Sequence, residues 1–94
     1  MYPIHPGVHL KEYLEELGLS QNAFAKSLGV SPMRISHIIH GSRPITAEMA
    51  ILFGKAFNQT PQFWMNLQNS YDLKLAEKVI NARRTILQPL ALAA

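Results

Sequence analysis

The chain has 94 residues, a formal net charge of +3 and no cysteine. This length suits one small domain, and with 48% hydrophobic residues the chain can form a core and is not expected to be disordered. The absence of cysteine excludes disulfides and thiolate metal ligands. No apolar run reaches the roughly eighteen residues that span a bilayer, and no basic segment precedes an apolar one at the amino terminus. We therefore expect a cytoplasmic protein without a secretory signal or membrane contact.

The first predicted helix covers about residues 6–17 and follows an extended arm at residues 1–5. Leu10, Leu14 and Leu17 recur at i, i+4 and i+7, which predicts one buried stripe. The outer face of this helix is acidic and consists of Glu12, Glu15 and Glu16. A solvated surface is the simplest interpretation of that face, ahead of a dedicated partner site.

Two short helices joined by a glycine turn are predicted between Ser20 and Gly41. Ser20 and Ser31 each precede a helix start, where a serine hydroxyl accepts a hydrogen bond from a free backbone N–H. Gly29 lies between the helices and can adopt the positive φ that ends a helix. The inward faces of the two helices are apolar: Phe24, Ala25, Leu28, Ile35, Ile38 and Ile39. This pattern is a helix-turn-helix, whose second helix enters the major groove of DNA.

The outer side of the second helix carries the side chains that can contact DNA: Met33, Arg34, His37 and His40. No acidic residue occurs from Leu17 to Ala47, whereas Lys26, Arg34 and Arg43 all lie in that window. A basic window around the reading helix is what contact with phosphates requires. The residues alone therefore predict a protein that reads double-stranded DNA.

Thr46 is predicted to cap a fourth helix that runs to about Phe57, behind a loop of turn-forming residues at 41–45. Arg43 in this loop and the free N–H groups at the start of the helix can together bind one phosphate. A solvated loop arginine is an equally simple alternative.

Thr60 and Pro61 predict the cap and start of a fifth helix that covers residues 61–85. Apolar side chains recur along it at steps of three and four residues: Phe63, Trp64, Leu67, Tyr71, Leu75, Val79 and Ile80. A four-helix domain has too little surface to cover so long a stripe. We expect the second half to pair with another copy in a homodimer, with packing inside one chain as the alternative. Residues 86–94 form an apolar tail, either frayed or part of an interface.

Two histidine pairs, His5 with His9 and His37 with His40, have spacings that occur in metal sites. Two ligands do not make a site, and neither pair has a glutamate placed as in H-E-x-x-H. The sequence also lacks a phosphate-binding loop and any arrangement of a nucleophile with a base. We therefore expect no metal, no cofactor and no catalytic site.

Six motifs of this chain occur together in one known family: His5–Gly7, Leu19–Gln21, Leu28–Ser31, Arg34–Ser36, Gly41–Thr46 and Phe63–Leu73. They resemble the HigA antitoxins, also called VapI or plasmid-maintenance antidote proteins, which belong to the Xre class of helix-turn-helix regulators. The helix-turn-helix part is shared by the whole class, whereas the last motif is specific to the antitoxin branch. The resemblance implies an all-α, five-helix domain of the lambda-repressor type over residues 1–94.

The resemblance implies two roles. One is neutralisation of a HigB toxin, a RelE-like ribonuclease that cuts mRNA at the ribosome; the other is repression of the toxin–antitoxin operon by a homodimer on a palindromic operator. A stand-alone phage-repressor-like regulator without a toxin is one alternative, and an antitoxin that binds DNA weakly is another. Without a long disordered tail, toxin binding would use the folded arm and first helix, including Tyr2, Tyr13, Glu12, Glu15 and Glu16.

Positions carried over from the repressor class give each interface residue an expected role. Gln21 matches the glutamine that binds phosphate and supports the reading helix. The positions that match base contacts are Met33, Arg34 and His37. The positions that match phosphate contacts are Ser31, His40 and Arg43. Since Met33 and His37 depart from the residues common in antitoxins, base reading is expected to depend largely on Arg34, whose guanidinium can bind guanine O6 and N7.

Overall fold

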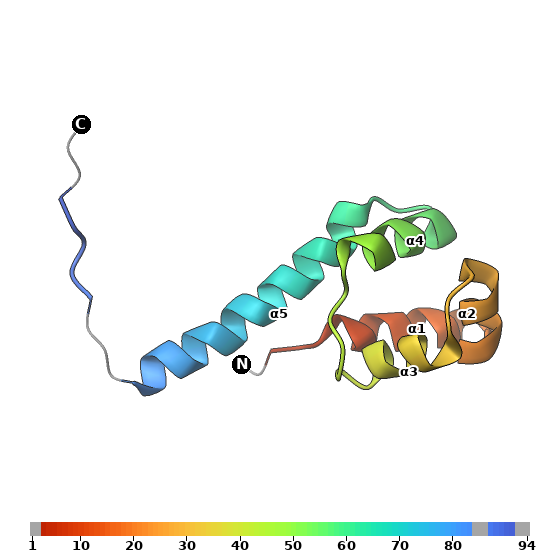
Figure 1. Cartoon of the computed structure of the whole chain (residues 1–94), viewed down its shortest axis with the longest axis horizontal. Helices are drawn as coiled ribbons and strands as arrows, with labels where there is room; N and C mark the ends of the chain where they lie inside the picture. Colours follow the sequence, from red (N-terminus) through yellow and green to blue (C-terminus); the bar gives the residue numbers. More distant parts are fainter. Residues whose placement is uncertain (1–2, 84–86, 92–94) are drawn as a thin grey trace.

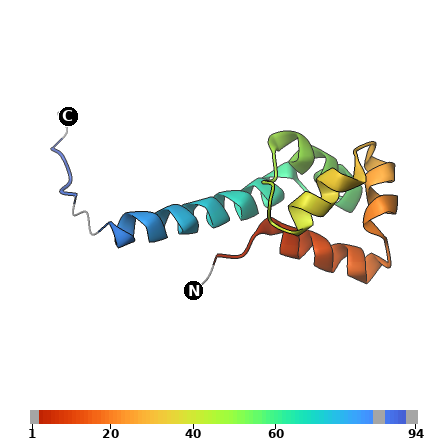
Figure 2. The same cartoon turned by 60° about the horizontal axis from the view of Figure 1, so that its bottom comes forward.

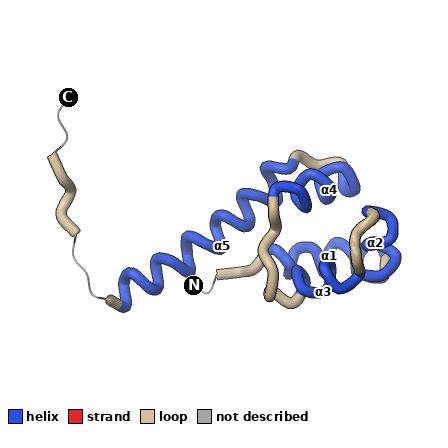
Figure 3. The backbone as a smooth tube through the Cα atoms, viewed as in Figure 1, coloured by secondary structure: helices blue, strands red, loops and turns tan. Residues whose placement is uncertain are grey.

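The computed structural model describes residues 3–83 and 87–91, which contain five α-helices and no strand (Figure 1). The helices are α1 (Pro6–Leu17), α2 (Gln21–Leu28), α3 (Pro32–Ile39), α4 (Ala47–Phe57) and α5 (Pro61–Ala82). Figure 3 shows them joined by loops without regular structure, the loop from α3 to α4 passing near the start of α1. The predicted all-α fold with five helices is therefore confirmed.

Helix starts follow the capping pattern of the sequence, with one exception. The hydroxyls of Ser20, Ser31 and Thr46 each accept a hydrogen bond from the backbone N–H three residues further on, as predicted. Thr60 precedes α5, but its hydroxyl makes no such bond, so this predicted cap was wrong. An unpredicted cap precedes α1, where Nδ1 of His5 accepts a hydrogen bond from the backbone N–H of Gly7 at 2.9 Å.

The core is built from apolar side chains of all five helices and the loop before α4: Leu10, Leu14, Phe24, Ala25, Ile35, Ile38, Ile45, Met49, Ala50, Phe53 and Trp64. Leu17 was wrongly predicted to belong to it, because 62% of this residue is exposed. The helix ends there, and Gly18 turns the chain with a φ of +63°. Leu19, rather than Leu17, consequently packs against the core.

Aromatic residues join α1, α4 and α5 around the fully buried Trp64. Its ring lies 5.1 Å from that of Phe53 and 5.6 Å from that of Tyr13, both in edge-on geometry. The indole N–H donates to Oε1 of Gln59 at 3.1 Å, and Nε2 of Gln59 donates to the hydroxyl of Tyr13 at 3.0 Å. The tryptophan of the antitoxin-type motif therefore anchors the long helix to the domain.

The helix α5 packs on the domain only through its first half, and its second half extends away from the other helices (Figure 2). Trp64 and Gln68 are its buried residues. From Asp72 onward its described residues are exposed. Leu73, Leu75, Val79 and Ile80 are 40–63% exposed. The expectation that the domain leaves the second half uncovered is confirmed, whereas its pairing with another copy stays a prediction. No described helix is long and apolar enough to cross a bilayer.

Candidate nucleic-acid interface

The helix α3 presents its outer side while its inner side enters the core. Ile35 and Ile38 are at most 1% exposed, and Met33, at the start of the same helix, is 66% exposed. Pro32 occupies the first helical turn, where its missing N–H leaves no hydrogen bond unmade. Burial of the two isoleucines thus fixes the rotation of α3 about its axis and leaves Met33 on the outer side.

Arg34 is not a freely extended side chain. Its Nη1 lies 3.7 Å from Oε1 of Glu48 in the first turn of α4, and the two side chains are 31% and 68% exposed. An exposed pair of this kind stabilises the fold by only about 0–1 kcal/mol, so its main effect is to limit the directions that the guanidinium takes. Sequence reasoning missed Glu48, because the residue lies fourteen positions from Arg34 on another helix.

The two histidines of α3 have different surroundings. His37 is half-buried, and its backbone carbonyl accepts hydrogen bonds from the N–H of Ser42 at 2.9 Å and of Arg43 at 3.3 Å. His40 is exposed, and its Nδ1 lies 2.7 Å from the carbonyl oxygen of Ser36. Nδ1 of His40 therefore carries the proton and donates it to this carbonyl. Its Nε2 can donate to a phosphate only when the ring is protonated.

Ser31 and Gln21 lie at the starts of α3 and α2. The hydroxyl of Ser31 accepts a hydrogen bond from the backbone N–H of Arg34 at 3.2 Å, and its own hydrogen stays available to donate outward. Gln21 is half-buried and lines a shallow hollow together with Ile39 of α3. This position beside α3 is compatible with the supporting role that the resemblance implies for Gln21.

Arg43 is exposed on the loop between α3 and α4, and contacts from other helices hold this loop. Oε1 of Gln68, on α5, accepts a hydrogen bond from the backbone N–H of Ile45 at 2.7 Å. His5 lies against the loop from the side of α1, because a Cβ atom added to Gly41 would be 3.6 Å from its ring. Neither Gln68 nor His5 was predicted to support the interface, since no local spacing relates them to residues 41–45.

The surroundings of His5 shift the pKa of its imidazole. Burial lowers the pKa of its imidazole from the ordinary value of 6.5, and this effect outweighs a hydrogen bond to the backbone of Arg43 and the charge of Asp72, which both raise it. The neutral ring is the form that the fold needs, since Nδ1 must be unprotonated to accept the hydrogen bond from Gly7. This histidine therefore has a structural role as the cap of α1.

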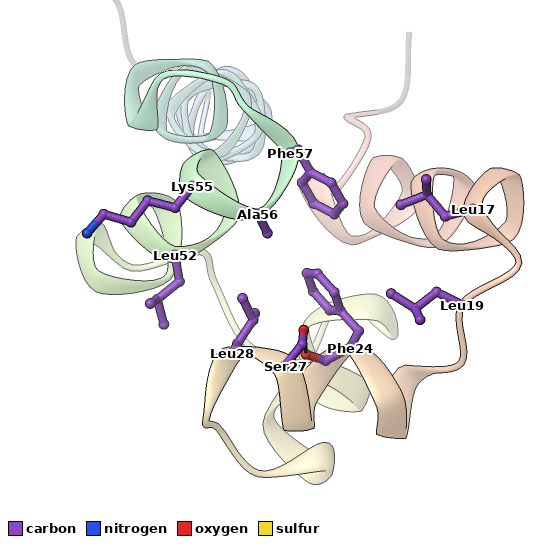
Figure 4. Close-up of a pocket in the computed structure, with 9 residues that line it drawn as sticks. All are labelled: Leu17, Leu19, Phe24, Ser27, Leu28, Leu52, Lys55, Ala56 and Phe57. Carbon is purple, nitrogen blue, oxygen red and sulfur yellow. Dashed lines mark hydrogen bonds between the residues drawn. The ribbon is translucent and has the colours of Figure 1, made fainter.

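A second surface feature lies at the carboxyl-terminal ends of α2 and α4, away from Gln21 and Glu48 at the starts of these helices. It is an open groove of about 450 Å³ lined mainly by apolar side chains from the end of α1 and from α2 and α4 (Figure 4): Leu17, Leu19, Phe24, Ser27, Leu28, Leu52, Lys55, Ala56 and Phe57. Leu17 and Phe57 also line a smaller adjoining hollow together with Glu16. The groove therefore borders the acidic face of α1.

Comparison with known proteins gives the family. Residues 10–64 match the helix-turn-helix family HTH_3. Virulence-associated protein I of Dichelobacter nodosus is 48% identical over 79 residues, 83% of this chain and 73% of that protein. A HigA-family addiction module antidote protein from Coxiella burnetii superposes with a TM-score of 0.88 at 41% identity, over 96% of this chain and 100% of that one. Pseudomonas aeruginosa antitoxin HigA, solved with the higBA promoter, has a TM-score of 0.88 at 40% identity, over 95% and 99% of the two chains. The chain therefore belongs to the HTH_3 helix-turn-helix family and, within it, to the branch of the HigA antitoxins.

Proposed function

We propose that this protein is an antitoxin that binds operator DNA as a homodimer and represses its own toxin–antitoxin operon. The observation that carries the proposal is the outward side of α3, where Met33 and Arg34 are available to bases in a window without acidic residues from 17 to 47. The related antitoxin HigA was solved with its promoter, and antitoxin GraA with its operator. Both likenesses extend over at least 95% of this chain.

Each interface residue has a role in this proposal. Arg34 binds a guanine edge, a contact worth about 1–3 kcal/mol of discrimination, and Met33 packs on a thymine methyl. His37 approaches the bases from the next turn of α3. The phosphate contacts come from residues around this helix: Gln21, Ser31, His40 and Arg43. Glu48 restrains Arg34 before binding, which reduces the conformational freedom that the guanidinium loses on the operator.

Neutralisation of a HigB-like toxin is the second part of the proposal. A ribonuclease needs a basic surface for RNA, and the exposed Glu12, Glu15 and Glu16 of α1 complement such a surface. The adjoining apolar groove would receive a side chain of the toxin (Figure 4). Tyr13 lines the smaller hollow beside Glu16, and its hydroxyl accepts a hydrogen bond from Nε2 of Gln59. Tyr2, which was also expected in this surface, lies outside the described residues.

Titration of the pure protein onto its own promoter fragment and onto a scrambled fragment, at two salt concentrations, tests DNA reading. We expect tighter binding to the promoter and a steep loss of affinity at higher salt. The logarithm of the binding constant should fall with the logarithm of the salt concentration with a slope of about 0.9 per neutralised phosphate. Equal binding to both fragments at both salts would contradict the repressor role and leave protein binding as the function.

Toxin neutralisation needs its own experiment. Any small basic ribonuclease-like protein encoded next to this gene would be co-expressed with the chain, and cell growth and co-purification would be measured. Rescue of growth and a stable complex are expected. A variant that combines Glu12→Gln with Glu16→Gln should lose the complex while keeping its DNA affinity, because these two residues, unlike Glu15, do not line the hollow beside Gln21 and Ile39. Absence of rescue would favour the alternative, a regulator without a toxin partner.

A further inference from the structure

The loop that carries Arg43 is connected to α5 by a buried side chain. Gln68 is 4% exposed and is the buried polar residue of the part of the chain that the structure describes. Its Oε1 accepts the hydrogen bond from the N–H of Ile45, two residues after Arg43, and its Nε2 donates to Oδ1 of Asp72 at 2.9 Å. One side chain therefore links the loop at 41–45 to the middle of α5.

The opposite side of this loop is held by His5. The ring of His5 is close to Gly41 and makes a hydrogen bond with the backbone of Arg43. It also meets Tyr71 of α5 edge-on, with 4.9 Å between ring centroids. The backbone on both sides of Arg43 is consequently fixed, whereas the Arg43 side chain itself is exposed.

The chemistry of Gln68 is specific to the loop. A methionine would occupy nearly the same volume in an apolar environment, so space filling alone does not require an amide here. The amide instead satisfies the N–H of Ile45, which would otherwise be buried without a partner because Ile45 is 2% exposed. The glutamine therefore determines where the backbone at Ile45, and hence the nearby Arg43, is placed.

We infer that Gln68, held by Asp72, is a positioning residue of the DNA interface: it sets the 41–45 loop so that Arg43 reaches a phosphate. The inference rests on the proposed DNA binding and deepens it. Gln68 lies about 1.4 helical turns before Leu73, the first apolar residue of the exposed half of α5. The helix that we propose joins the two copies therefore also fixes a phosphate contact in each copy.

The test compares Gln68→Met with Gln62→Met, since Gln62 is exposed on the same helix. Operator and scrambled DNA are titrated over a range of salt concentrations, and sedimentation velocity measures the oligomeric state. Gln68→Met should bind both DNAs more weakly by the same factor, with a salt slope lower by about 0.9 per copy, or about 1.8 for the dimer, as expected for one lost phosphate contact per copy. The state of assembly should not change. Gln62→Met should bind as the wild type does, and an unaltered salt slope in Gln68→Met would overturn the inference.

A double-mutant cycle shows whether Gln68 acts through Arg43. If it does, Gln68→Met combined with Arg43→Ala should lose no more affinity than Arg43→Ala alone. Additive losses would mean that Gln68 has only a general structural role and would overturn the inference while leaving the proposed function intact. Failure of the wild-type protein to prefer its promoter would instead contradict the proposed function.

Asp72 provides a second pair of variants if Gln68→Met unfolds. Asp72 is exposed, so neither Asp72→Ala nor Asp72→Asn should disturb the core. Both remove the same charge, but asparagine retains an oxygen that accepts the hydrogen bond from Nε2 of Gln68. Asp72→Ala should therefore bind DNA more weakly than Asp72→Asn, and this difference should vanish in an Arg43→Ala background. Equal affinities of the two Asp72 variants would overturn the inference.

Discussion

At the scale of single residues, the two arginines of the proposed interface differ in how they are held. Arg34 lies beside Glu48, with a side chain that is 31% exposed, so the fold limits its direction before DNA arrives. Arg43 is exposed, and the fold holds its backbone instead. A side chain with restricted directions suits recognition of one base edge, whereas an exposed arginine on a held backbone suits a phosphate, which offers charge without sequence information.

Substitution of each arginine should therefore have a different signature. Arg34→Ala should reduce the preference for operator over scrambled DNA by about 1–3 kcal/mol, because a contact to a guanine edge is lost. Arg43→Ala should weaken binding to both DNAs by the same factor and lower the salt slope by about 0.9 per copy, or about 1.8 for the dimer. Competition titrations with the two fragments measure both effects. Equal losses of the two variants on both DNAs would contradict the assignment.

His5 should make the stability of the fold depend on pH. Because its pKa in the folded protein is lowered, the unfolded chain takes up the proton more readily. The contribution of His5 to the free energy of unfolding is therefore complete above pH 6.5 and is lost as the pH falls through the lowered pKa of the folded state. Asp72, Arg43 and Tyr71 face this ring and set the size of the effect.

The variant His5→Asn keeps a side chain that can cap α1 but cannot take up this proton. Between pH 7.5 and pH 5, urea unfolding should show a smaller loss of stability for this variant than for the wild type. His9→Asn is the matched control, since it removes a histidine from α1 without removing the cap. If the loss of stability between pH 7.5 and pH 5 were reduced equally in both variants, the cap position of His5 would not be the cause.

At the scale of helices, sequence patterns predicted the elements well and their long-range contacts poorly. Ser20, Ser31 and Thr46 marked helix starts correctly, because a cap is a local interaction within one turn. The pairs Arg34 with Glu48 and Ile45 with Gln68 were not predicted, since they join residues on separate elements whose relative placement depends on the whole core. The assigned contacts with DNA stay predictions that the proposed titrations test.

The crossing of α1 over α3 depends on a glycine. A Cβ atom on Gly7 would collide with the backbone carbonyl of Ile38. Gly7→Ala should therefore destabilise the fold by about 1–3 kcal/mol through overpacking, although alanine favours a helix by about 1 kcal/mol over glycine elsewhere. Val8→Ala, at a neighbouring position that is 45% exposed, should change stability by less than about 0.5 kcal/mol. Urea denaturation of both variants measures the difference, and a stabilised Gly7→Ala would contradict the close approach.

At the scale of the whole molecule, α5 extends beyond the domain as a helix with uncovered apolar residues (Figure 1). Leu75 and Val79 continue the buried stripe of Trp64 and Gln68, because they lie close to whole helical turns after Trp64. Leu73 and Ile80 lie nearly half a turn away from Trp64. We expect the stripe of Leu75 and Val79 to pair with a second copy, since it continues the face of α5 that packs on the domain through Trp64.

Val79→Glu tests this pairing, because it would place one unpaired charge from each copy in the interface. The variant should raise the dissociation constant of the dimer at least about tenfold, as measured by sedimentation velocity. Binding to a full palindromic operator should then fall toward that of a half-site, while half-site binding stays the same, since α3 and its surroundings are unchanged. Asn81→Glu adds the same charge on the far side of α5 and should leave the dimer intact. A Val79→Glu protein that remains dimeric would place the dimer interface elsewhere on the chain.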